Sequence, residues 1–217
     1  MNHLVRIACI QRTILIGCVV ALLFLMTSCS GETSPDQSSG ERLAGSLVDL
    51  FQEELASPDL TEFEREVLTR AVSTGGISDV DYESAFQLYR QCLDDAGQVV
   101  SWTKGSDGIH QASPHFESQE DVNRWSDDSL KCATGTVFRI EALYRIQQNN
   151  PGLYADPFQA VIVCWQRVGK SIPNYGVEDL RRDITSMEED SATPSSFDLS
   201  DDDVWTCLSG NGFSFGS

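Results

Sequence analysis

Four cysteines constrain this chain more than any other feature of its sequence. Seven cysteines occur in all, and three of them fall within the first thirty residues. The other four are spread over the remainder: Cys92, Cys132, Cys164 and Cys207. Their spacing contains no Cys-x-x-Cys pair, which argues against a thioredoxin-like redox motif or a zinc ribbon. An even number of cysteines in an exported chain predicts two disulfides, with a four-thiolate metal site as the alternative.

Four cysteines allow three disulfide connectivities. We favour Cys92 with Cys132 and Cys164 with Cys207, because this pairing joins sequence neighbours and closes one loop in each half of the domain. Each loop of about 40 residues would contribute roughly 4 kcal/mol in the chain-entropy model. Reduction is therefore expected to loosen the fold severely.

The first 29 residues have the pattern of an export signal. Arg6 and Arg12 precede an uncharged stretch, residues 13–26. This stretch is too short to cross a bilayer about 30 Å thick, but it suits the apolar region of a signal peptide. The run Leu25-Met26-Thr27-Ser28-Cys29 resembles a bacterial lipobox. We expect residues 1–28 to be removed and Cys29 to carry the lipid, including palmitate; an ordinary signal peptide and an uncleaved anchor are the alternatives.

Charge and composition divide the expected mature chain into a tether and an acidic domain. The formal net charge is −18, and it becomes −20 without residues 1–28, which hold two arginines and no acidic residue. Residues 29–40 are rich in Ser, Gly and Pro, so the lipidated Cys29 is expected to be followed by a flexible tether. Such an acidic chain is not expected to bind nucleic acid, and it is repelled by anionic lipid headgroups. A lipid would then hold it at the membrane.

Residues 41–217 are predicted to form one mainly α-helical domain with a small β-hairpin at about 98–116. Apolar residues recur at helical spacing in most segments, and capping residues precede several of them. Ser78 and Asp156-Pro157 are the clearest helix starts, and residues 201–203 would open a short final helix. One long helix is expected from about residue 126 to Pro151, and residues 188–196 are expected to be polar loop.

Three of the four cysteines share a local pattern. Each of Cys92, Cys164 and Cys207 is followed, five positions later, by a glycine: Gly97, Gly169 and Gly212. Each glycine stands where an apolar helical pattern stops, so it is expected to end the helix in the left-handed conformation. A duplication and a chance recurrence are both compatible with this echo.

Several short motifs resemble those of a loose group of uncharacterised secreted lipoproteins from actinobacteria. They include Tyr89-Arg-Gln-Cys92-Leu93 with Ala96-Gly97, then a short hairpin, Cys132 before an aromatic-rich helix, Asn150-Pro151, and Cys164 before Gly169. The resemblance covers roughly residues 60–215. It implies an envelope domain with four cysteines and brings no catalytic residues with it.

Trp102, His110 and His115 are the candidate recognition residues. All three belong to the predicted hairpin, and Trp is frequent at binding hot spots. The two histidines, five apart, are expected on opposite faces of one strand. Packing within the hairpin is the alternative interpretation of Trp102, and solvated positions are the alternative for the histidines.

The sequence offers little catalytic chemistry. It lacks a Gly-x-Ser-x-Gly elbow, a His-Glu-x-x-His motif and a phosphate-binding loop. The acidic run Asp201 to Asp203 has neither the spacing nor the glycine of an EF-hand, and a helix N-terminus favours acids without any ion. No cofactor, metal site or catalytic residue is therefore predicted.

These observations predict an extracytoplasmic lipoprotein, anchored to the cell membrane, that acts as a non-enzymatic accessory or binding module of the envelope. Its expected partner is another envelope protein, such as a component of a transport system. A small extracytoplasmic hydrolase is the alternative. Replacing His110 and His115 would separate the two, because nearly every hydrolase mechanism available to this chain needs one of them as a base.

Overall fold

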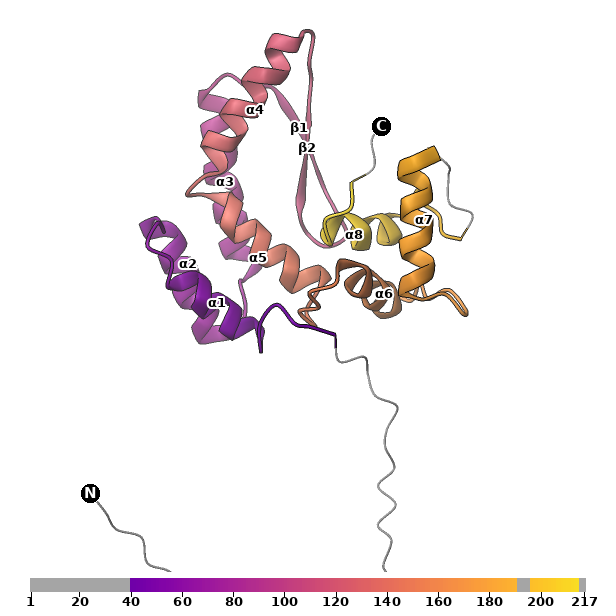
Figure 1. Ribbon diagram of the computed structural model, residues 1–217. Helices are drawn as coiled ribbons and strands as arrows, with labels where there is room; N and C mark the ends of the chain where they lie inside the picture. Colours follow the sequence, from indigo (N-terminus) through magenta and orange to yellow (C-terminus); the bar gives the residue numbers. More distant parts are fainter. Residues whose placement is uncertain (1–39, 191–195, 215–217) are drawn as a thin grey trace, which may run out of the picture. The chain divides into compact units, whose positions relative to one another are not determined.

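The computed structural model describes residues 40–190 and 196–214. The signal peptide, Cys29 and the tether up to residue 39 lie outside the described residues. Within them the chain forms eight α-helices and one two-stranded antiparallel hairpin (Figure 1), which confirms the predicted mainly α-helical fold with a single hairpin. The helices are α1 Leu47–Leu55, α2 Glu62–Thr74, α3 Asp79–Asp95, α4 Gln119–Ala133, α5 Val137–Asn149, α6 Pro157–Arg167, α7 Val177–Asp190 and α8 Asp202–Gly210. The strands are β1 Val100–Lys104 and β2 His110–Pro114.

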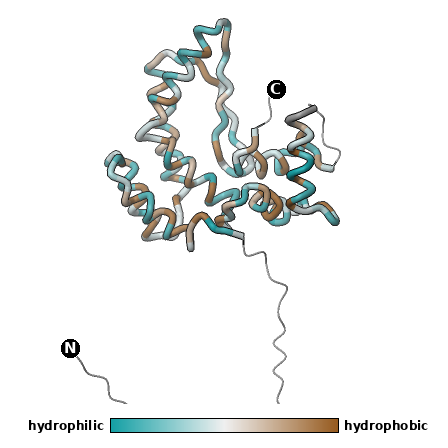
Figure 2. Tube along the Cα trace, viewed as in Figure 1, coloured by the Kyte–Doolittle hydropathy of each residue, from teal (hydrophilic) through white to brown (hydrophobic). Residues whose placement is uncertain are grey.

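One hydrophobic core joins α1, α2, α3, α5 and the hairpin. Its buried members include Phe51, Leu68, Tyr82, Phe86 and Ile140. Hydrophobic and hydrophilic residues are interleaved along these helices, as amphipathic packing requires (Figure 2). Burial of these apolar faces is what holds the hairpin, since an isolated two-stranded hairpin is marginal in water.

A second core is formed by α6, α7 and α8. Trp165 of α6 is almost fully buried there, and its indole nitrogen donates to the carbonyl of Val204 at 3.3 Å. Leu180 and Ile184 of α7 and Leu208 of α8 complete the same cluster. The three C-terminal helices thus have apolar contacts of their own.

The two disulfides follow the favoured connectivity. Cys92 of α3 bonds Cys132 of α4, with Cα atoms 5.5 Å apart. Cys164 of α6 bonds Cys207 of α8, with Cα atoms 5.7 Å apart. Each disulfide therefore joins two helices, and one of the two lies within the second core.

The hairpin occupies a shorter stretch than residues 98–116. Its register pairs Val100 with Pro114 and Lys104 with His110. Pro114 lacks an N–H, so it suits the last position of an edge strand. His115 follows the strand and is exposed; the expectation of two histidines on opposite faces of one strand is therefore wrong.

The long helix expected before Pro151 is two helices, and the first begins earlier than predicted. Ser118 caps α4 by accepting from the N–H of Asp121, so α4 starts well before residue 126. The chain then leaves the helical conformation at Thr134 and turns at Gly135, where φ is +78°. Apolar spacing continues through this break, which is why the sequence pattern concealed it.

The other predicted helix boundaries agree closely with the structure. The side chain of Ser78 accepts from the N–H of Asp81 at the start of α3, and Asp156 caps α6 with Pro157 behind it. The cap of α8 is Asp201, which accepts from the N–H groups of Asp203 and Val204. One boundary differs, because α7 continues to residue 190, into the expected polar loop.

The three glycines that follow cysteines end their helices in the same way. Gly97, Gly169 and Gly212 have φ values of +77°, +77° and +91°. In each case the next residue donates its N–H to the carbonyl five residues back, at distances of 2.9, 2.8 and 3.1 Å, which is the long bond of a Schellman motif. The recurring sequence pattern therefore corresponds to the same helix C-terminal motif after Cys92, Cys164 and Cys207.

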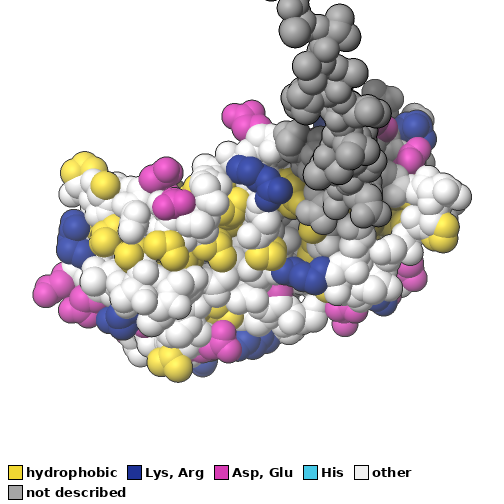
Figure 3. All heavy atoms as spheres, turned by 90° about the horizontal axis from the view of Figure 1, so that it is seen from below, with side chains coloured by type: hydrophobic (Ala, Val, Ile, Leu, Met, Phe, Trp, Pro, Cys, Tyr) yellow, Lys and Arg dark blue, Asp and Glu magenta, His cyan; other side chains and the backbone are white. Residues whose placement is uncertain are grey.

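No helix within the described residues has the length and apolar character needed to cross a membrane. The acidic side chains visible on the face shown in Figure 3 are dispersed, with lysines and arginines among them.

Candidate functional site

A groove of about 630 Å³ lies between the hairpin and α5, and we call it the hairpin groove. One wall comes from α3 and the hairpin: Phe86, Tyr89, Trp102, His110, Gln111 and Ala112. The opposite wall comes from α4 and α5: Ala133, Val137, Phe138, Glu141, Ala142 and Arg145. Gly210 of α8 and Gly212, two residues after it, also line the groove. Most of the lining is apolar, with a few polar groups, as in typical ligand sites.

Stacked rings make the hairpin wall rigid. His110 lies flat on Phe86, with ring centroids 3.7 Å apart and an angle of 7° between the planes. Trp102 meets Phe86 and Tyr89 edge to face, at 4.9 and 5.9 Å. Tyr82 stacks on His110 in turn, with ring centroids 6.0 Å apart. Such contacts fix side-chain orientation, so the wall is largely formed before any ligand arrives.

Tyr82 connects the hairpin to α5 through its hydroxyl group. The hydroxyl accepts from the backbone N–H of His110 at 2.9 Å and donates to Glu141 at 3.1 Å. Burial, together with the carboxylate of Glu141, raises the pKa of Tyr82 well above its ordinary value. The phenol therefore stays protonated and continues to donate to Glu141 at any physiological pH.

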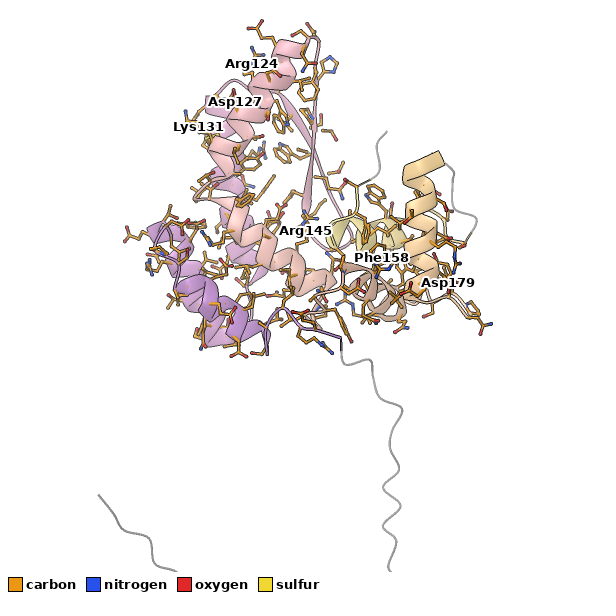
Figure 4. All side chains as sticks on the ribbon, in the orientation of Figure 1. Arg124, Asp127, Lys131, Arg145, Phe158 and Asp179 are labelled. Carbon is orange, nitrogen blue, oxygen red and sulfur yellow. A yellow bond between two sulfur atoms is a disulfide. The ribbon has the colours of Figure 1, made fainter. Side chains whose placement is uncertain are left out.

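Glu141 and Arg145 supply the charged groups of the α5 wall. Their side chains form an ion pair across one helical turn, with Nη2 and Oε1 2.8 Å apart. Arg145 lies between α5 and the hairpin (Figure 4). Since both side chains are about three-quarters shielded from solvent, a polar ligand group in the groove would meet two preoriented charges.

Glu83 of α3 holds the imidazole of His110. Both of its carboxylate oxygens lie 3.1 Å from Nε2 of His110, and Lys104 also pairs with Glu83. Burial opposes ionisation of Glu83, but hydrogen bonds from Lys104 and His110 outweigh it and hold its pKa below the ordinary value. The imidazole of His110 is thus fixed in orientation by Phe86 and Glu83 together.

The structure brings together two of the three predicted recognition residues. Trp102 and His110 both line the hairpin groove, whereas exposed His115 does not. Nε2 of His110 faces the carboxylate of Glu83. Two of the three predicted residues therefore lie in the wall of one groove.

Sequence reasoning missed the wall supplied by α5. Phe138, Glu141, Ala142 and Arg145 stand at positions i, i+3, i+4 and i+7 of one helix face. This spacing indicates, from the sequence alone, that the four side chains lie on one face of a helix. The large apolar side chain of Phe138 is 65% exposed, so this face of α5 is not fully covered by the rest of the described domain.

The acidic run at residues 201–203 has a structural role. Asp201 caps α8 and pairs with Lys170, which holds the pKa of Asp201 below its ordinary value; Asp203 lies 3.8 Å from the same lysine. Within residues 40–190 and 196–214, no group of three His, Cys, Asp or Glu side chains is placed to hold a metal ion.

This chain was compared with known protein families, curated proteins and solved structures, and it has no match among them.

Proposed function

We propose that this protein is a lipid-anchored, extracytoplasmic binding module of the cell envelope that holds its partner in the hairpin groove. The observation that carries the proposal is the groove itself, with aromatic and aliphatic walls and a fixed pair of charges at Glu141 and Arg145. Its lining within the described residues has one carboxylate and no serine, threonine or cysteine, so its chemistry suits binding.

Export and anchoring rest on the sequence, with support from the disulfides. Two disulfides suit an oxidising compartment outside the cytoplasm. Cys29 would carry the lipid, and a second acyl chain would make attachment lasting. The net charge of the chain keeps its surface away from anionic headgroups, leaving the groove free for a partner.

Metabolic labelling tests the anchor. Cells that express the protein are fed an alkyne analogue of palmitate, and the protein is examined for label and for its distribution between membrane and soluble fractions. Cys29→Ser is expected to lose the label and to leave the membrane fraction, while Cys18→Ser keeps both. Label retained by Cys29→Ser would refute lipidation at this residue.

Photocrosslinking in intact cells tests the groove. Phe138 is replaced by p-benzoylphenylalanine, and Leu130 is the matched control because its 63% exposure is close to the 65% of Phe138 and it lies outside the groove lining. A distinct crosslinked product at position 138 with none at 130 is expected. Equal yields at the two positions would contradict a binding role for the groove.

A further inference from the structure

We infer that the partner enters the hairpin groove as an extended polypeptide segment that adds a third strand to β2, with apolar side chains at alternate positions and basic residues beside them. This inference rests on the proposed function and specifies its partner. It follows from four observations: a groove along an unpaired strand edge, the outward direction of the backbone groups on that edge, the apolar side chains that line the groove, and the charge of the chain.

The first observation is that the groove follows the edge of β2. His110, Gln111 and Ala112 are consecutive and all three line the groove. Consecutive side chains of a strand point to opposite faces of the sheet, so three consecutive residues can line one groove only along the edge of the strand. Trp102 is the one residue of β1 in the lining. Within the described residues the sheet has two strands, so the outer edge of β2 has no strand beside it.

The second observation is the direction of the backbone groups. Residues of an antiparallel strand alternate between bonding the neighbouring strand and facing outward. His110 donates its N–H to Tyr82, so the backbone groups of His110 face away from β1. Because these positions alternate along the strand, the register places the backbone groups of Ala112 and Pro114 on the same outward edge. The N–H of Ala112 and the carbonyls of His110 and Ala112 are therefore placed for a further strand.

The third observation concerns the side chains of the added strand. Those on its inner side would lie against Phe86, Trp102 and Phe138, which favours apolar residues at every second position. Main-chain bonds supply affinity in strand addition, and such pockets supply specificity. The five residues of β2 correspond to a segment about 17 Å long.

The fourth observation is the charge of the chain, which favours an added strand from another protein over one from a second copy of this chain. At a formal net charge of −18, two copies repel one another, whereas a basic segment is attracted and steered toward the domain. The opposite face of the hairpin is polar and exposed at Ser101, Thr103, Gln111 and Ser113, so the outer residues of the added strand can carry lysine or arginine.

The test uses a synthetic seven-residue peptide of alternating lysine and valine, acetylated and amidated. Two matched peptides carry N-methyl groups on all valines or on all lysines, which removes the N–H donors along one edge or the other. Binding to the intact protein is followed by titration calorimetry and by hydrogen exchange at the Ala112 amide. We expect the parent peptide to bind and to slow that exchange, and one methylated peptide alone to lose at least tenfold in affinity.

Protein variants give a second measurement. Ala112→Pro removes the outward N–H of β2 and is expected to weaken peptide binding at least tenfold. Val100→Pro is the control, because the register places it on the outer edge of β1. Thermal unfolding of both variants shows whether each still folds; should Ala112→Pro unfold, the comparison of the two methylated peptides decides.

Three results would overturn the inference. Methylated peptides that bind equally well would exclude strand addition, and so would absence of peptide binding. A dimer of the protein alone that Ala112→Pro abolishes would make a second copy the occupant. Crosslinking at position 138 that persists in cells while no peptide binds would remove this inference and leave the proposed function in place.

Discussion

His110 of the hairpin stacks flat on Phe86 of α3, with ring centroids 3.7 Å apart, while its Nε2 faces the carboxylate of Glu83. One histidine thus fixes the hairpin to the helix beneath it in two ways. The side chain is only 16% exposed, so the contact is shielded from water. It also explains how a short hairpin can form one wall of a groove.

Replacing His110 is expected to destabilise the domain in two separable steps. His110→Phe keeps a ring on Phe86 but loses the bond to Glu83, and His110→Ala loses both. We expect a loss of roughly 1 kcal/mol for the first and about 2–3 kcal/mol for the second. Urea unfolding measures both values, with exposed His115→Ala as control; equal losses for the two His110 variants would show that the stacking contributes nothing.

The contacts of Glu83 with Lys104 and His110 predict a pH dependence of stability. The folded state holds the pKa of Glu83 below its ordinary value of about 4.5, so its contribution is complete above about pH 5 and is lost as pH falls through the lowered pKa. Glu83→Gln should therefore lower the melting temperature at pH 7 and make its fall between pH 6 and pH 3 less steep. Differential scanning calorimetry across this range measures both effects.

Glu53→Gln is the matched control for Glu83→Gln, because Glu53 is an exposed side chain on α1. It should leave both the melting temperature at pH 7 and its dependence on pH close to those of the parent. If Glu83→Gln behaves like this control, the ion pair with Lys104 and the hydrogen bond with His110 contribute no measurable stability.

The parts of the fold that the sequence predicted are those set by local chemistry. Ser78 and Asp156 lie at helix starts because their side chains satisfy N–H groups of the first turn, and Gly97 ends α3 because it adopts a positive φ at little cost. The break at Gly135 was not predicted because Cys132, Thr136 and Ile140 keep a four-residue helical spacing across it.

Local sequence patterns did not predict the hairpin groove. It exists because residues near 86, 112 and 141 meet in space, and that meeting depends on how α3 and α5 pack. Trp102 and His110 were selected for their chemistry, while the partners that orient His110, namely Glu83 and Phe86, are distant from it in sequence. A residue type can suggest recognition, but its neighbours come from the tertiary fold.

The disulfide within the second core is expected to carry much of that region's stability. Cys164 and Cys207 close a loop with a separation of 43 residues, for which the chain-entropy model gives about 4 kcal/mol. The double variant Cys164→Ala with Cys207→Ala should lose about this amount in urea unfolding. Hydrogen exchange should accelerate mainly in α6 and α8, because this disulfide joins those two helices.

The double variant Cys92→Ala with Cys132→Ala is the matched comparison, since its loop has a separation of 40 residues. It should lose a similar free energy of unfolding, with faster exchange mainly in α3 and α4. Identical exchange patterns in the two double variants would mean that the disulfides do not act on separate pairs of helices.

Two kinds of glycine should respond differently to alanine. At Gly169, φ is +77° and an added Cβ would meet no atom within 4 Å, so Gly169→Ala should cost only the backbone strain of about 1–2 kcal/mol. At Gly210 the added Cβ would lie 2.3 Å from side-chain atoms of Asn149, which bonds Asp107. Gly210→Ala should therefore displace α8 from α5 and cost more than Gly169→Ala.

Urea unfolding of the two alanine variants measures this difference, and Gly97→Ala provides the control. Gly97 shares the φ of Gly169 and has equally open space around its Cβ position, so its loss should match that of Gly169→Ala. Since Gly210 also lines the hairpin groove, Gly210→Ala should weaken binding of the lysine and valine peptide, whereas Gly169→Ala should leave it unchanged. A smaller loss at Gly210 than at Gly169 would show that Asn149 yields without disturbing the contact between α5 and α8.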